Sequence, residues 1–141
     1  MTDKCVAVLG SNCFTGANFV KRCLKEPGLR VVGISRSPQP GLPFLPYKWD
    51  DTAADARERF CFYQRDLNRD CDSILDLLND EQPNWIVNFS AQGMVSQSWD
   101  NPEDWFQTNT LSQVQLHDGL RGLESLEKFV QASTPEVYGS C

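Results

Sequence analysis

The chain has 141 residues, of which 40% are hydrophobic and 23% are charged, as in an ordinary globular domain. Its formal net charge of −6 argues against nucleic acid or an anionic membrane as a partner, because either would repel an acidic surface. No apolar run approaches the ~18 residues of a membrane span. The N-terminal stretch lacks the pattern of a signal peptide, so we expect a cytoplasmic protein.

Short apolar runs alternate along the chain with segments of helical periodicity. This alternation predicts an α/β fold, namely a Rossmann-like, doubly wound parallel sheet of about five strands in the order 3-2-1-4-5. Four prolines in the segment 37–49 exclude a regular helix or central strand there. The predicted strands are 4–9, 29–35, 60–64, 85–89 and 128–132, and the predicted helices are 15–25, 52–59, 72–79 and 101–120.

The predicted helix over 101–120 carries two apolar stripes. One consists of Phe106, Leu111 and Val114, and the other of Trp105, Leu116 and Leu120. Two stripes predict two contacts, one with the sheet and one with another chain or a further segment. We therefore expect a homo-oligomer that forms through exposed apolar surface or through strand edges.

The six cysteines and the single histidine, His117, do not form a metal-binding pattern. The cysteines stand at positions 5, 13, 23, 61, 71 and 141, and none belongs to a C-x-x-C pair. We expect no metal site, and we expect the cysteines to be reduced and mostly buried.

A glycine-containing loop joins the first strand to the first helix. Gly10 and Gly16 have the spacing of the outer glycines in a G-x-x-G-x-x-G loop, whose helix offers backbone N–H groups to a pyrophosphate. Cys13 occupies the middle position. After the second strand, Ser35-Arg36-Ser37 supplies hydroxyls and a cation but no acid, which favours NADP over NAD. The alternatives are a plain turn and a solvated arginine.

These motifs resemble the N-terminal part of the extended short-chain dehydrogenase/reductase family, the nucleotide-sugar epimerases and dehydratases. The resemblance covers essentially all 141 residues, in order. It extends to an acid after the third strand, to the segment 88–98, and to an asparagine in the long helix. It also includes the segment 133–139, which is similar to the S-[ST]-x-x-V-Y-G signature. By this resemblance, the cofactor-binding residues are Gly10, Asn12, Cys13, Phe14, Thr15, Gly16, Ser35, Arg36, Ser37, Asp66, Leu67, Ser90, Ala91, Gln92 and Asn109.

The resemblance implies catalytic roles for Thr134 and Glu136. Thr134 would hydrogen-bond the reacting sugar oxygen, and in 4,6-dehydratases a glutamate in the place of Glu136 takes the C5 proton after oxidation at C4. Pro135 stands where many of these enzymes have an aspartate and the GDP-mannose dehydratases a serine, so another group would have to protonate the departing hydroxyl. The stretch AQGMVSQSW and Ser35-Arg36-Ser37 are most similar to the GDP-mannose 4,6-dehydratase group, although Gly93-Met94 replaces its Ser-His.

The family's Y-x-x-x-K motif does not occur in the 141 residues. We therefore expect residues 1–141 to be an NAD(P)-binding domain that is a truncated, N-terminal fragment, inactive alone, without the catalytic Tyr-Lys helix or the substrate domain. The alternatives are a stand-alone dinucleotide-binding or non-catalytic Rossmann module, including a cofactor-free scaffold, and a fragment of a nucleotide-sugar decarboxylase.

Overall fold

The computed structural model describes residues 4–49 and 58–139. The predicted helix over 52–59 lies largely outside these residues, as does Cys141. Within the described residues, no helix combines the length and the apolar character that crossing a membrane requires.

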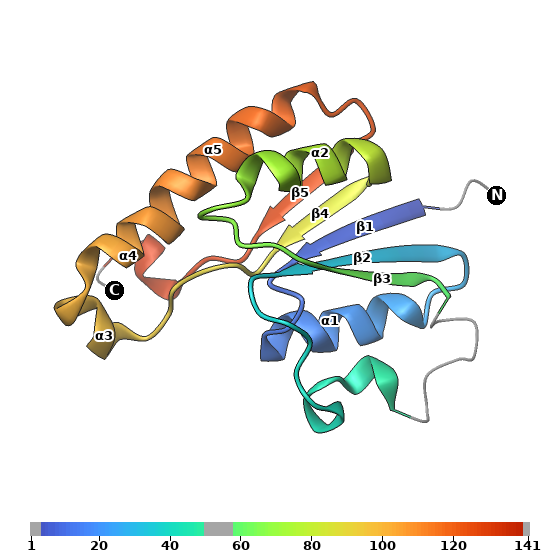
Figure 1. Cartoon of the computed structure of the whole chain (residues 1–141), viewed down its shortest axis with the longest axis horizontal. Coiled ribbons are helices and arrows are strands. Elements are labelled where there is room, and N and C mark those ends of the chain that lie inside the picture. Colours follow the sequence, from blue (N-terminus) through green and yellow to red (C-terminus); the bar gives the residue numbers. More distant parts are fainter. Residues whose placement is uncertain (1–3, 50–57, 140–141) are drawn as a thin grey trace.

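Five parallel strands form one sheet in the order β3-β2-β1-β4-β5 (Figure 1), which confirms the predicted fold class and strand order. The strand order reverses between β1 and β4, because β2 and β3 are added on one side of β1 and β4 and β5 are added on the other side. The loops that follow β1 and β4 therefore diverge and leave a crevice at the carboxyl edge of the sheet. The strands are β1 (Lys4–Leu9), β2 (Leu29–Ser35), β3 (Phe60–Gln64), β4 (Trp85–Asn88) and β5 (Lys128–Gln131).

Helices cover both faces of the sheet, with α1 on one face and α2 and α5 on the other (Figure 1). The short turns η1 and η2 of the proline-rich segment lie on the α1 side. All five strands point toward the side of the molecule where α3 and α4 lie. The helices are α1 (Phe14–Leu24), η1 (Leu42–Phe44), η2 (Pro46–Lys48), α2 (Cys71–Glu81), α3 (Val95–Asp100), α4 (Pro102–Phe106), η4 (Gln107–Leu111), α5 (Ser112–Gly119), η5 (Leu120–Gly122) and η6 (Pro135–Tyr138).

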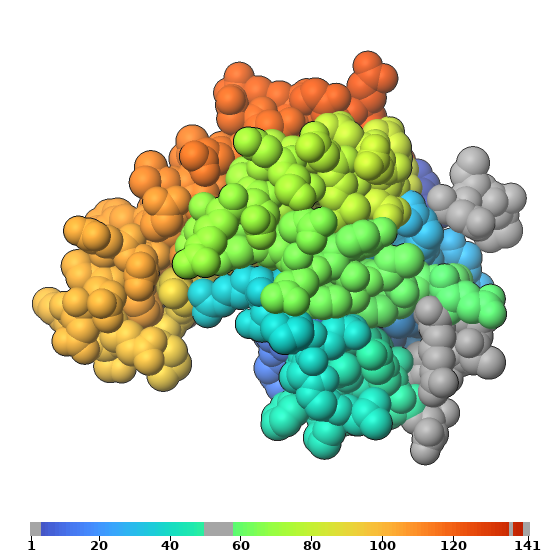
Figure 2. Space-filling view, viewed as in Figure 1, coloured from blue at the N-terminus to red at the C-terminus, as the bar shows by residue number. Residues whose placement is uncertain are grey.

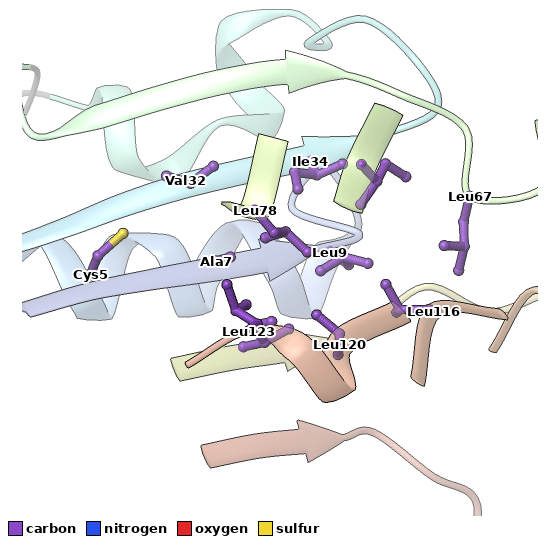
Figure 3. Packing of buried hydrophobic residues seen from close by; sticks show 12 residues of the cluster. Cys5, Ala7, Leu9, Val32, Ile34, Leu67, Leu78, Leu116, Leu120 and Leu123 are labelled. Atoms are coloured by element: carbon purple, nitrogen blue, oxygen red, sulfur yellow. The ribbon is translucent and has the colours of Figure 1, made fainter. Parts of the chain in front are cut away.

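Each face of the sheet carries its own hydrophobic core. Successive residues of a strand point to opposite faces, so Ala7 and Leu9 of β1 contribute to one cluster while Val6 and Val8 contribute to the other. Figure 3 shows the first cluster, in which Leu9 and Ile34 from the strands meet Leu78 from α2 and Leu116 and Leu120 from the long helix. Because both faces are covered, β1 is an almost continuous run of apolar residues.

The long helix differs from its prediction. A π-helical turn, η4, separates α4 from α5, and the backbone N–H of Ser112 bonds to the carbonyl of Gln107. The preceding helix α3 was not predicted. Leu116 and Leu120 pack on the sheet, as one stripe predicted, whereas Phe106, Leu111 and Val114 of the other stripe are 68%, 55% and 62% exposed.

The expectation of mostly buried cysteines holds for only part of the chain. Cys5 and Cys23 are buried, and burial raises the pKa of each thiol to about 11. Cys13 and Cys61 are exposed, because one lies in the glycine loop and the other lies on the edge strand β3.

Candidate cofactor site

A cavity of about 330 Å³ opens at the carboxyl edge of the sheet, where the loops after β1, β2, β3 and β4 converge. Figure 2 shows the surface hollowed between the residues that follow β2 (cyan) and those of α3 and α4 (gold). The crevice at a strand-order reversal is the usual ligand site of open α/β sheets. The polar and charged residues that line the cavity are Asn12, Cys13, Ser35, Arg36, Ser37, Arg65, Asp66, Asn68, Ser90 and Thr108.

The glycine loop is shaped by two close approaches. Gly10 has a φ of +76°, and a Cβ atom there would lie 2.9 Å from the carbonyl carbon of Phe89. A Cβ atom on Gly16 would lie 2.3 Å from the Gly10 carbonyl oxygen. Any larger residue at either position would push the loop away from β4 or the helix away from the loop.

Cys13 caps the N-terminus of α1. Its Sγ accepts a hydrogen bond from the backbone N–H of Gly16 at 3.2 Å, as a serine or aspartate cap would. The first N–H groups of a helix, here those of Phe14 and Thr15, have no acceptor within the helix itself. Because Cys13 also lines the cavity, the positive end of α1 lies at the cavity wall.

Asn12 joins the glycine loop to the segment after β2. Its backbone N–H donates to Ser35 Oγ at 3.0 Å, and its Nδ2 donates to the carbonyls of Ser37 and Pro38 at 2.9 and 3.1 Å. Its Oδ1 is buried and has no hydrogen-bond partner among the described residues. These bonds bring Arg36 and Ser37 to the cavity rim beside the glycine loop.

The loop after β3 brings opposite charges to the cavity. Asp66 Oδ1 accepts the N–H of Asn68 at 3.0 Å, which fixes the turn that follows the strand. Arg65 also lines the cavity, and its Nε donates to Ser73 Oγ at 2.9 Å. Among the described residues, the charged side chains of the lining are therefore two arginines, Arg36 and Arg65, and one aspartate, Asp66. This described part of the wall is net positive although the chain carries a formal charge of −6.

The loop after β4 is held by amide side chains. The fully buried Asn88 accepts the N–H of Ser90 on its Oδ1 at 2.8 Å. Asn109 Oδ1 accepts the backbone N–H of Gln92 at 2.9 Å, and Asn109 Nδ2 donates to the carbonyl of Gln92 at 3.0 Å. Ser90 and Ala91 line the cavity, whereas Gln92 and Asn109 stand outside the lining.

A family model described as GDP-mannose 4,6 dehydratase matches residues 8–141. The chain belongs to this family. The GDP-mannose 4,6-dehydratase of Yersinia enterocolitica is 31% identical over 127 residues, which are 86% of this chain and 33% of that relative. The chain thus spans about a third of the relative's length.

Solved structures share the fold of this family member. The UDP-Glc/GlcNAc 4-epimerase of Campylobacter jejuni superposes with a TM-score of 0.79 at 21% identity, over 96% of this chain and 39% of that one. An enzyme of Bordetella bronchiseptica in complex with NAD+ gives a TM-score of 0.73 at 22% identity, over 96% of this chain and 37% of that one.

The structure brings most of the predicted cofactor-binding residues to one cavity. Those that line it are Gly10, Asn12, Cys13, Ser35, Arg36, Ser37, Asp66, Leu67, Ser90 and Ala91, while Phe14, Thr15, Gly16, Gln92 and Asn109 lie outside the lining. Sequence reasoning missed Arg65, Asn68 and Thr108. The position of Arg65 could have indicated that it lies at the cavity, because it directly precedes the predicted cofactor-binding residue Asp66.

The two predicted catalytic residues lie beyond β5. Thr134 precedes η6, and its carbonyl accepts the N–H of Val137 at 3.2 Å. Glu136 belongs to η6 itself. Thr134 does not line the cavity, although β5 runs parallel to β4 and therefore delivers this segment to the same edge of the sheet.

Proposed function

We propose that this chain is the NADP-binding portion of a nucleotide-sugar 4,6-dehydratase, with GDP-mannose as the substrate class of the whole enzyme. The observation that carries the proposal is the cavity at the strand-order reversal, formed by the glycine loop, the capped end of α1 and Arg36. When bound, the nicotinamide of such a cofactor accepts and returns a hydride. The dehydratase names of the relatives and the match over residues 8–141 support the substrate class.

The preference for NADP is inferred from the charge of the cavity. A 2′-phosphate needs cationic partners, and in the part of the chain that the structure describes, the guanidinium groups of Arg36 and Arg65 are the cations that line the cavity. NAD is the alternative cofactor, because the Bordetella bronchiseptica structure contains NAD+. An acid at the end of β2 would favour the ribose hydroxyls of NAD, and the chain has Ser35-Arg36-Ser37 there.

We further propose that this chain binds the cofactor without turning over a sugar nucleotide. Thr134 and Glu136 would contact the sugar, but the 141 residues contain no Y-x-x-x-K motif to supply a tyrosine base and its lysine.

A second copy of the chain would cover the exposed stripe Phe106, Leu111 and Val114, because three large apolar side chains at helical spacing form a surface that water solvates poorly.

Separate calorimetric titrations with NADP and NAD test the cofactor proposal. We expect saturable binding of both dinucleotides, with a smaller dissociation constant for NADP. A parallel assay with NADP and GDP-mannose should show no product. Absence of binding with either dinucleotide would contradict the proposal and favour a cofactor-free module.

A further inference from the structure

Two pairs of polar side chains on the long helix contact two different loops of the cavity. Thr108 and Ser112 form one pair, and Asn109 and Gln113 form the other. Within each pair the residues are four positions apart, which places their side chains on the same side of a helix. The π-helical turn lies at this point, and such turns occur frequently at functional sites.

The first pair holds the loop after β3. Asn68 Nδ2 donates to Thr108 Oγ1 at 2.9 Å, and Ser112 Oγ donates to Asn68 Oδ1 at 2.8 Å. Both ends of the Asn68 amide are therefore bound by one helix. Asn68 lines the cavity two positions after Asp66, so the helix fixes this part of the wall.

The second pair holds the loop after β4. Asn109 binds the N–H and the carbonyl of Gln92, as described above. Gln113 Nε2 donates to the carbonyl of Ser90 at 3.2 Å, and Gln113 Oε1 accepts from Asn88 Nδ2 at 2.7 Å. One glutamine thus connects the end of β4 and a cavity-lining residue to the helix.

We propose that the long helix braces both loops of the cofactor cavity and that Gln113 is its principal positioning residue. The cofactor part of this inference rests on the proposed function. Gln113 does not line the cavity and acts through Ser90. Its amide also donates to the carbonyl of Thr108 at 3.2 Å, so it links the π-helical turn, β4 and the loop. Without this amide, the buried Asn88 loses an acceptor and the Ser90 carbonyl loses its donor.

The test is Gln113→Leu, with Gln115→Leu as the matched control, because Gln115 is exposed on the same helix. Site-resolved amide hydrogen exchange and calorimetric titration with NADP are measured on both. In Gln113→Leu we expect exchange in residues 89–92 to accelerate by about tenfold and the NADP dissociation constant to rise by a similar factor, as for one lost hydrogen bond. Asn109→Ala, a change at an exposed position, should accelerate exchange of the Gln92 amide in particular.

Two results would overturn the proposal that the long helix holds the loops of the cavity. A third would separate this proposal from the proposed cofactor binding. Exchange in 89–92 equal to that of Gln115→Leu would overturn it. Faster exchange throughout the sheet, with a matching fall in the unfolding midpoint, would also overturn it, because the role would then be general stability. If the unmodified chain binds neither dinucleotide, the proposed function fails, while the exchange rates still decide whether Gln113 holds the loop.

Discussion

Gly16 packs so closely against Gly10 that the loop and the helix leave no room for a methyl group between them. We expect Gly16→Ala to lower the free energy of unfolding by about 2 kcal/mol, within the usual range for an overpacked site. Urea denaturation measures this change. Gly122→Ala is the control, since a Cβ atom there would meet no atom within 4 Å. Equal stability of the two variants would contradict the close packing.

The two arginines of the cavity should discriminate between the cofactors. We expect Arg36→Ala and Arg65→Ala each to weaken NADP binding by about tenfold, as a lost charge-assisted hydrogen bond does. NAD binding should change little, because NAD has no 2′-phosphate. Arg121→Ala, an exposed position outside the cavity, serves as the control in the same calorimetric titrations. Equal losses for NADP and NAD would assign the arginines to another part of the dinucleotide.

Cys13 provides a chemical probe of the cavity. We expect NADP to protect Cys13 from alkylation, because the thiol stands at the cavity wall, and to leave Cys61 unprotected, because it is exposed on the edge strand. Peptide mass spectrometry after treatment with iodoacetamide resolves the two sites. Cys5 and Cys23 should react slowly with or without NADP, since burial raises the pKa of each to about 11. Protection of Cys61 to the same extent as Cys13 would indicate a general effect on the fold.

Glu81 should make stability depend on pH in the acid range. Its burial opposes ionisation, but the hydrogen bonds from Tyr63 and Arg30 outweigh burial and hold the pKa of the carboxyl below its ordinary value. A carboxyl with a lowered folded-state pKa stabilises the protein fully above the unfolded value, about 4.3, and loses that contribution as pH falls through the folded value.

We therefore expect Glu81→Gln to lower the free energy of unfolding at pH 7 and to lose this effect at low pH. Denaturation at several pH values measures the difference, with the exposed Glu124→Gln as control. A deficit that stays constant down to pH 2 would show that the charge of Glu81 contributes nothing.

The exposed stripe of the long helix should control self-association. We expect Leu111→Glu to convert a dimer to a monomer, because it places a charge in the centre of the apolar surface. Light scattering measures the mass at several concentrations. Gln115→Glu introduces the same charge at an exposed position without removing an apolar side chain. A monomeric parent chain would refute association through this stripe.

The central strands β1, β2 and β4 could be predicted because they are largely buried on both faces and therefore appear as short apolar runs. The glycine loop was recognisable for a similar reason, since Gly10 and Gly16 meet steric demands that no other residue satisfies. Both signals are local. The strand order came from interpreting the alternation of strands and helices as a doubly wound, Rossmann-like sheet.

The network around the long helix could not be predicted, because its contacts join residues far apart in the chain. Asn68 meets Thr108 across 40 positions, and Asn88 meets Gln113 across 25. A single polar residue in a helix does not indicate which distant residue its side chain will hydrogen-bond. The π-helical turn also changes the periodicity of the apolar residues too little to be predicted from the sequence. Asn109, which was assigned to the cofactor by resemblance, has its amide bound to Gln92, and its contact with a cofactor stays a prediction.

The place of β1 in the sheet has a consequence for how the chain folds. β1 pairs on one side with β2, its near neighbour in sequence, and on the other side with β4, which lies much farther along the chain. The bond from the Cys5 N–H to Asn84 Oδ1 spans 79 positions, and closing so long a loop is slow. The contact between Phe89 and Gly10 can therefore form only after residue 89 has been synthesised. A ribosome-bound chain shorter than this would carry the complete glycine loop and still have no cavity.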